Sequence, residues 1–390
     1  MAGASAPQVR PATLYPPPGS VPPTNSSEVQ HWLKELDLSG APDICLNQGN
    51  PPQCDSIVDP NSCHWSCHNC AADDVVACPD LNIWGLSFDD GPTNITPDLL
   101  EFLQEHQVRA SFFLIGGNVV LRPDIVYEML TQGHHIASHT WSHKALTTLT
   151  NEEIVAEVKW TEKAIEDTIG YRVKYLRPPY GDIDDRVRFV LKKMGYIVVD
   201  WGGDTFDVQD WRISGGQVTP SQVIINFEAA LDTHVESHSY SRGGFISLEH
   251  DVTVDTFAVA KELIPYGLSK KIDIQPIAKC LHDAHPYQTT LSAEHMPVKS
   301  NNSSVNRVTH RPTIITTTTT STATPIKSLA TVQAHKSKNS TQERAESDRM
   351  AAKIARSASA ISSAGAADYD PVTWLGAALG SLLTMAMVWM

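Results

Sequence analysis

Short apolar segments alternate with longer amphipathic segments between residues 80 and 282 of the chain. Short apolar runs are typical of buried strands, and apolar residues three or four apart are typical of helices. The predicted strands cover residues 83–88, 110–115, 135–138, 175–176, 196–199 and 245–248. Two predicted helices begin at Thr96 and Thr150, and four others cover residues 123–132, 184–194, 220–231 and 253–261. This alternation predicts an α/β domain with a parallel sheet or barrel.

Two of the predicted helices carry specific start signals. Thr150 and Glu153 have the spacing of a capping box, and the helix that they open is expected to end near Gly170. Thr96 precedes Pro97, a residue favoured at the first helical position, so Thr96-Pro97 is expected to cap its helix. Local chemistry therefore supports the assignment made from periodicity.

The periodic pattern stops on both sides of this region and divides the chain into four parts. Residues 1–79 form an N-terminal flank that is expected to be partly disordered, and residues 80–282 form one domain. Residues 283–365 are rich in Ser and Thr and include a run of threonines at 316–320, so they predict a disordered, glycosylated stalk. The predicted glycosylation sites are Asn25, Asn94, Asn301, Asn302 and Asn339.

The fourth part, residues 366–390, resembles the signal for a glycosylphosphatidylinositol anchor. An uncharged apolar tail, residues 374–390, follows a polar spacer and the small residues Ser363-Ala364-Gly365, which predicts lipid attachment at Ser363. The alternative is a single membrane-spanning helix, but the tail is short for that and no basic residues follow it. The first thirty residues contain no apolar core of a secretory signal, so we expect the start of the chain to be incomplete.

Six of the seven cysteines lie in a short stretch before the domain. They are Cys45, Cys54, Cys63, Cys67, Cys70 and Cys78, and the seventh is Cys280. The spacing around His64 and His68 also fits half of a zinc knuckle, but the second half is missing. The secretory signs favour disulfides, with one thiol left over and the pairing open.

The chain is acidic, with a formal net charge of −14 and a pI near 5.5. Binding to phosphate backbones requires a basic surface, so no nucleic-acid partner is expected. An acidic surface keeps a secreted protein soluble.

Two polar motifs follow predicted strands. Asp89-Asp90-Gly91-Pro92 ends the first strand, and His139 and His143 follow the third. Two histidines four apart and one carboxylate can bind a divalent metal and leave a position open for water, as in catalytic zinc sites. Adjacent aspartates before Gly-Pro are also common in turns, and a His pair can lie on a surface by chance. The combination of both motifs favours a metal site.

Three further segments follow in order: 177–181, which contains Arg-Pro-Pro-Tyr-Gly, 201–207 and 246–251. The series resembles the polysaccharide deacetylase family with its NodB-like domain, and within it the fungal chitin deacetylases. The resemblance covers about half of the chain. It implies a distorted (β/α) barrel of seven strands, with the motifs at the C-terminal ends of the strands. It also implies that Cys280 is bridged to an upstream cysteine.

The same resemblance implies roles for individual residues. Asp90, His139 and His143 are the expected metal ligands, and Zn²⁺ or Co²⁺ is the expected ion, one per chain. Asp89 is the expected base, Arg177 keeps Asp89 ionised, and His250 protonates the departing amine. The expected substrate-binding residues are Tyr180, through its backbone N–H, Leu248 in a pocket for the acetyl methyl, Trp201, Asp207 and Trp211.

The fourth segment departs from the family pattern. An Asp-Trp pair is expected at its end, but Val208 follows Asp207, and Asp210-Trp211 comes three residues later. Either Asp207 keeps its place beside His250, or Asp210-Trp211 takes it. Both alternatives stay open in the sequence.

The predicted function is a metal-dependent hydrolase that removes acetyl groups from chitin or partly deacetylated chitosan in the fungal cell wall. The alternative is a wall-anchored chitin-binding protein with the same fold and little catalysis. The chain is expected to be an extracellular monomer, held at the cell membrane by its lipid anchor or transferred to the cell wall.

Overall fold

The computed structural model describes residues 11–236 and 243–290. The predicted lipid site Ser363 and the sequons at Asn301, Asn302 and Asn339 lie outside these residues, as does the chain beyond residue 290. In the described part, no helix is both long and apolar enough to cross a membrane.

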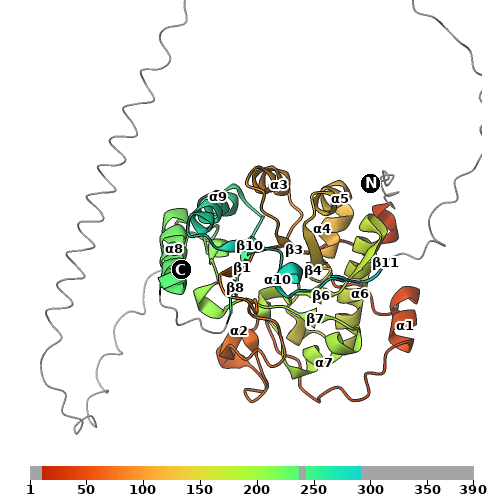
Figure 1. Cartoon of the computed structure of the whole chain (residues 1–390). Helices are drawn as coiled ribbons and strands as arrows, with labels where there is room; N and C mark the ends of the chain where they lie inside the picture. The colour runs from red at the N-terminus through yellow and green to blue at the C-terminus, as the bar shows by residue number, and fades with distance from the viewer. Residues whose placement is uncertain (1–10, 237–242, 291–390) are drawn as a thin grey trace, which may run out of the picture. The chain divides into compact units, whose positions relative to one another are not determined.

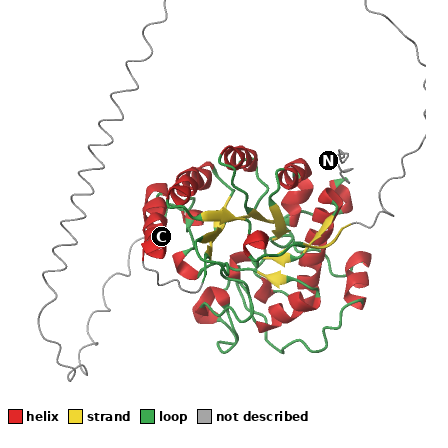
Figure 2. Ribbon diagram, in the orientation of Figure 1, coloured by secondary structure: helices red, strands yellow, loops and turns green. Residues whose placement is uncertain are grey.

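Parallel strands form the centre of the fold, with helices around them (Figures 1 and 2). The first strand is interrupted at Leu86, so it is divided into β1 (Ile83–Gly85) and β2 (Ser87–Asp89). β1 pairs with β10 (Asp273–Gln275) and β8 (Phe245–Ile246), whereas β2 pairs with β3 (Ser111–Leu114) and β9 (Glu249–His250). Beyond β3 follow β4 (His135–Ser138), β6 (Tyr175–Leu176) and β7 (Ile197–Val198).

Backbone hydrogen bonds link the segment after β7 to β8 and the residues after it. The Gly202 N–H donates to the carbonyl of Ile246 (3.0 Å), and the Leu248 N–H donates to the carbonyl of Phe206 (3.0 Å). Within the described residues, the parallel strands are then β1/β2, β3, β4, β6, β7, β8/β9 and β10. The predicted distorted seven-stranded barrel is confirmed.

The helices agree closely with the apolar periodicity. The predicted ones are α3 (Thr96–Glu105), α5 (Pro123–Thr131), α6 (Asn151–Ile169), α7 (Asp185–Lys193), α8 (Pro220–Glu236) and α9 (Val254–Ser269). The short elements that were not predicted are α1 (Ser27–Lys34), α2 (Trp65–His68), α4 (Gly116–Leu121), α10 (Ile277–Cys280) and the 3₁₀ turns η1 (Ala12–Leu14), η2 (Cys54–Ser56), η3 (Leu146–Thr148), η4 (Pro179–Gly181), η5 (Gly203–Thr205) and η6 (Asp210–Arg212). Aromatic residues such as Trp84, Phe88 and Phe112 are completely or almost completely buried at the centre.

The two helix-start predictions have different outcomes. The capping box of Thr150 and Glu153 is present, and α6 ends at Gly170, whose φ of 79° is left-handed. The prediction for Thr96 is wrong, since Ile95 is the N-cap of α3 and no side chain caps it. The Thr96 hydroxyl donates instead to the buried carboxylate of Asp251, because a buried carboxylate requires a hydrogen-bond donor.

Both flanks extend the folded unit beyond the predicted domain. Trp32 of α1 packs edge-on against Trp160 of α6, with ring centroids 5.3 Å apart. At the other end, β11 (Tyr287–Thr290) pairs antiparallel with β5 (Tyr171–Val173). The fold therefore continues past residue 282, the predicted domain end. Asn25 and Asn94 are exposed, and their glycosylation stays a prediction.

Six cysteines form three disulfides, so the zinc-knuckle alternative is wrong. Cys78 pairs with Cys280 and links the two ends of the domain, as the family resemblance implied. The other pairs are Cys54–Cys67 and Cys63–Cys70, and Cys45 is the exposed free thiol.

Candidate active site

The predicted site residues lie at one end of the barrel. Asp89 is the last residue of β2, and His250 is the last residue of β9. His139 and Arg177 directly follow β4 and β6. The C-terminal ends of parallel strands meet at the same face, which is where β/α barrels hold their sites.

Three predicted site residues, Asp90, His139 and His143, form a group that could hold a metal ion. The Asp90 Oδ1 atom lies 3.4 Å from Nε2 of His139 and 3.1 Å from Nε2 of His143. One atom from each residue lies within 4.8 Å of the others. His139 Nδ1 is 2.8 Å from the carbonyl of Arg177, which can only accept a hydrogen bond. Nδ1 is thus the donor in this hydrogen bond, and Nε2 is the ring nitrogen that faces the group.

The chemistry of this group fits a divalent cation. Asp90 Oδ1 is buried and makes no hydrogen bond to any described residue, a state that is unfavourable unless another partner binds it. Burial raises the pKa of Asp90, but His139 and His143 outweigh that effect and hold it well below its usual value. A carboxylate with two imidazoles, partly open to solvent, is a typical catalytic metal-binding set.

Backbone conformation helps to aim these groups. Asp90, Thr140, His143 and Tyr180 have φ values of 76°, 63°, 59° and 62°. Residues other than glycine rarely adopt this left-handed region, and such strain persists only where surrounding contacts enforce it.

Asp89 and Arg177 form a buried ion pair beside the group. Arg177 Nη1 donates to Asp89 Oδ1 at 2.8 Å and to Ser87 Oγ at 2.9 Å. The guanidinium also donates to the carbonyls of Val199 and Asp200 and lies 4.2 Å from the ring centroid of Phe113. Arg177 is therefore held rigidly, and Asp89 Oδ2, 3.8 Å from His139 Nε2, faces the metal-binding group.

The sequence left open whether Asp207 or Asp210 lies beside His250, and the structure shows that it is Asp210. Asp210 Oδ1 lies 2.7 Å from His250 Nδ1, and Asp210 Oδ2 accepts from the His250 N–H at 2.9 Å. Asp207 accepts instead from the Gln209 N–H and, at 3.3 Å, from Trp211 Nε1. Burial would lower the pKa of His250, but Asp210 outweighs it and raises the pKa to about 10. Asp210 is thus the partner of His250, and Asp207 orients Trp211.

The predicted substrate-binding side chains differ in exposure. Tyr180 and Trp211 are 37% and 50% exposed, whereas Trp201 and Leu248 are 9% and 7% exposed. The Tyr180 ring lies 4.5 Å from the imidazole of His143, measured between centroids. Trp201 packs edge-on against Trp65 at 5.8 Å. Tyr180 and Trp211 are therefore the available aromatic surfaces, and Trp201 lies behind the loop that carries Tyr180.

Glu157 of α6 was missed in the sequence. Its carboxylate accepts from the N–H groups of Trp141 and Ser142, both at 2.8 Å, and so holds the turn between His139 and His143. Burial raises the pKa of Glu157 to about 7, although these donors oppose the shift. A glutamate on the apolar stripe of an amphipathic helix was the available signal.

Comparisons with known proteins agree with this arrangement. Residues 77–199 match the family model described as polysaccharide deacetylase. Chitin deacetylase 1 of Cryptococcus neoformans var. grubii is 44% identical over 246 residues, which are 61% of this chain and 52% of that protein. The chitin deacetylase of Amylomyces rouxii is 35% identical over 275 residues, 67% of this chain and 64% of that protein.

The chain therefore spans about half of the first relative and slightly less than two thirds of the second. A third relative, chitin deacetylase 1 of Saccharomyces cerevisiae, is 38% identical over 252 residues, 64% of this chain and 76% of that protein. With this identity and coverage, and with the family's motif residues gathered at one face of the barrel, the chain belongs to the polysaccharide deacetylase family.

Proposed function

We propose that this protein is a metal-dependent hydrolase that removes N-acetyl groups from chitin or partly deacetylated chitosan and releases acetate. One observation carries the proposal: Asp90, His139 and His143 lie at the same end of the barrel as Asp89 and His250. Asp89 is held by Arg177 and His250 by Asp210, as expected of groups that transfer protons. The names of the relatives support chitin as the polymer.

Asp90, His139 and His143 would hold the ion. Zn²⁺ and Co²⁺ suit this mixture of imidazole and carboxylate ligands. When bound, the ion acts as a Lewis acid toward the amide carbonyl of the substrate.

Asp89 is the proposed general base. Its Oδ1 atom is occupied by Arg177, so Oδ2 remains to take the proton of the attacking water. Arg177 orients the Asp89 carboxylate for this step. The water oxygen forms a bond to the carbonyl carbon, and the backbone N–H of Tyr180 is the proposed donor to the negative charge on the carbonyl oxygen.

His250 is the proposed general acid. Its Nδ1 atom is bonded to Asp210, so Nε2 remains to protonate the nitrogen as the C–N bond breaks. Because the pKa of His250 is raised to about 10, the imidazole carries its proton at neutral pH. Acetate and the free amine are the products, and the exposed rings of Tyr180 and Trp211 are the proposed contacts for sugar.

We place the protein outside the cell. The tail beginning at residue 374, the small residues around Ser363 and the sequons support a lipid-anchored glycoprotein, and three disulfides fit an oxidising compartment. A monomer is the proposed state.

Acetate release from soluble chitin oligomers tests the function. The full chain should release acetate, lose this activity when a chelator removes the ion, and regain it with Zn²⁺ or Co²⁺. Asp89→Asn should keep the ion and lose about 10²-fold or more in rate, the range for loss of a general base. If the protein contains the ion and binds oligomers but releases no acetate, the chitin-binding alternative is favoured.

A further inference from the structure

A single side chain from the N-terminal flank links two loops of the candidate site. Asn50 Oδ1 accepts from the N–H of Ala145 at 2.8 Å, and Asn50 Nδ2 donates to the hydroxyl of Tyr180 at 3.3 Å. Ala145 comes two residues after His143, and the Tyr180 ring packs against the His143 imidazole. Asn50 therefore connects the loops on both sides of a predicted metal ligand.

Trp65 of α2 contacts the same loop from behind. It is 4% exposed, and its indole meets Trp201 edge-on. Gly181 lies between the two rings: a Cβ atom there would be 2.7 Å from Trp65 Cδ1 and 2.8 Å from Trp201 Cη2. The loop fits between the two indoles only because residue 181 has no side chain.

This loop needs external support. Tyr180 and Gly181 both have a φ of 62°, a conformation that is strained for tyrosine. Turn η4 spans only three residues, so its own hydrogen bonds are few. Contacts with Asn50 and Trp65 are suited to hold the ring of Tyr180 in place.

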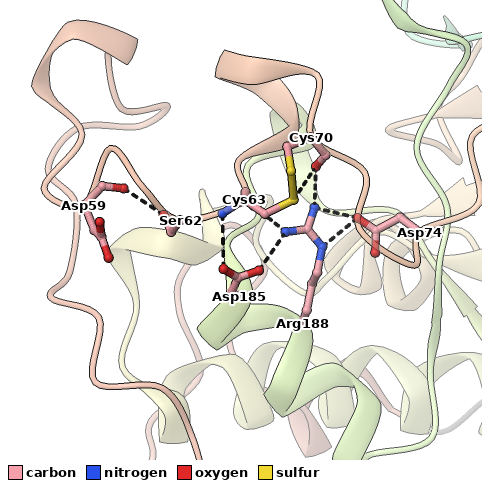
Figure 3. The surroundings of a disulfide bond; sticks show 7 residues. All are labelled: Asp59, Ser62, Cys63, Cys70, Asp74, Asp185 and Arg188. Atoms are coloured by element: carbon pink, nitrogen blue, oxygen red, sulfur yellow. Dashed lines mark hydrogen bonds and ion pairs between the residues drawn. A yellow bond between two sulfur atoms is a disulfide. The ribbon is translucent and has the colours of Figure 1, made fainter.

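The segment that carries these two residues is itself fixed to the barrel. We call residues 45–70 the cystine segment, since Cys54–Cys67 and Cys63–Cys70 lie within it. Arg188 of α7 donates to the carbonyls of both Cys63 and Cys70 and pairs with Asp74 (Figure 3). The Cys63 N–H donates to Asp185 at the start of α7 (3.2 Å). Two disulfides and the partly buried Arg188 thus hold this segment, which has little regular secondary structure.

We propose that the cystine segment is a wall of the active site, in which Asn50 and Trp65 are positioning residues that hold Tyr180 and its loop for catalysis. This inference rests on the proposed deacetylation. Neither residue belongs to the group of Asp90, His139 and His143, so their loss should alter catalysis and leave the ion bound.

The test compares full-length Asn50→Ala and Trp65→Ala with the parent chain. Steady-state acetate release from a soluble chitin oligomer gives kcat and KM, and metal analysis gives the ion content. Hydrogen exchange is measured at the N–H groups of Gly181 and Asp182, which donate to the carbonyls of Pro178 and Pro179 and so report on the loop. Both variants should lose about tenfold to a hundredfold in kcat/KM, since small displacements of positioned groups have effects of this size. Both should keep the ion and exchange these two N–H groups faster.

Three further variants separate positioning from general stability. Trp65→Phe should recover most of the loss, because it restores an aromatic ring against Gly181. The double variant Cys54→Ser/Cys67→Ser should show the same defect as Trp65→Ala. Phe102→Ala removes an aromatic contact with Phe257 on the outer helices, so it should lower Tm and leave kcat/KM and loop exchange unchanged.

Unchanged exchange at Gly181 and Asp182 in both Asn50→Ala and Trp65→Ala would overturn the inference, whether or not the parent is active. Unchanged kcat/KM in both, with an active parent, would also overturn it. An inactive parent that contains the ion would instead contradict the proposed function, and faster exchange would still support the positioning role.

Discussion

Asp207 and Asp210 are three residues apart, yet they contact different partners. Asp210 accepts two hydrogen bonds from His250, through Nδ1 and the backbone N–H. Asp207 orients the exposed indole of Trp211. Gln209, which lies between them, has a left-handed φ of 61°, so the chain turns there. We therefore assign Asp210 to the proposed proton transfer and Asp207 to the proposed substrate contact.

Substituting each carboxylate with its amide tests this division. Asp210→Asn removes the charge that raises the pKa of His250, so the imidazole loses its proton at lower pH. A general acid is active while protonated, and the rate falls as pH rises through its pKa. The alkaline limb of the kcat profile should therefore move down by about 1–3 pH units in Asp210→Asn.

Asp207→Asn is the matched control. It should weaken substrate binding through Trp211 and raise KM, with the alkaline limb close to that of the parent. If the alkaline limb of the kcat profile shifted in Asp207→Asn but not in Asp210→Asn, the two assignments would be reversed.

At the scale of elements, α6 shows how one helix serves both stability and the site. Its buried face carries two glutamates. Glu157 holds the turn between His139 and His143, whereas Glu162 pairs with Lys159 and Arg172 and accepts from the hydroxyl of Tyr196. Both are buried, so each needs the partners that it has.

Gln substitutions at these two positions should separate the roles. Glu157→Gln places an amide NH₂ group among N–H donors, which disturbs the turn. Affinity for Zn²⁺ should fall about 10–100-fold, as for other groups that orient metal ligands. Glu162→Gln makes the same change on the same helix and should lower Tm without changing Zn²⁺ affinity. Metal titration and thermal unfolding measure both effects, and equal Zn²⁺ affinity in the two variants would remove Glu157 from the site.

At the scale of the whole molecule, the folded unit is longer than the alternating pattern of strands and helices. Tyr287 of β11 stacks on Tyr171 at 5.0 Å, and its hydroxyl accepts from the Ile136 N–H at 3.4 Å. The Cys78–Cys280 disulfide joins residues 202 apart in sequence just before this strand. Strand β11 thus contacts both β4 and β5.

Shortening the chain tests where the catalytic unit ends. A chain that stops after residue 290 should release acetate like the full chain. A chain that stops after residue 282 loses β11, and its Tm should fall by about 2–4 °C or more. Equal Tm values for the two shortened chains would show that β11 adds no stability.

The proposed lipid anchor is tested on the full chain. A phosphatidylinositol-specific lipase should release the protein from membranes, and resistance to that lipase would contradict the anchor.

The sequence by itself determined the features that depend on neighbouring residues. The alternation of strands and helices and the capping box of α6 were predictable, because periodicity and local hydrogen bonding act within a few positions. The Asp89-Asp90 pair and the spacing of His139 and His143 indicated a metal site, whereas His250 was assigned through the resemblance to a family. The resemblance to a family then added the barrel and the pairing of Cys280 with an upstream cysteine.

Only the tertiary structure decided which distant groups meet. Asn50 and Tyr180 are 130 residues apart, and Arg188 reaches Cys63 across 125. The choice between Asp207 and Asp210 also depended on how η6 turns toward β9. Contacts of this kind follow from the packing of whole elements, which no local pattern encodes. For that reason the cystine segment read as a flank in the sequence and lies beside the active site in the fold.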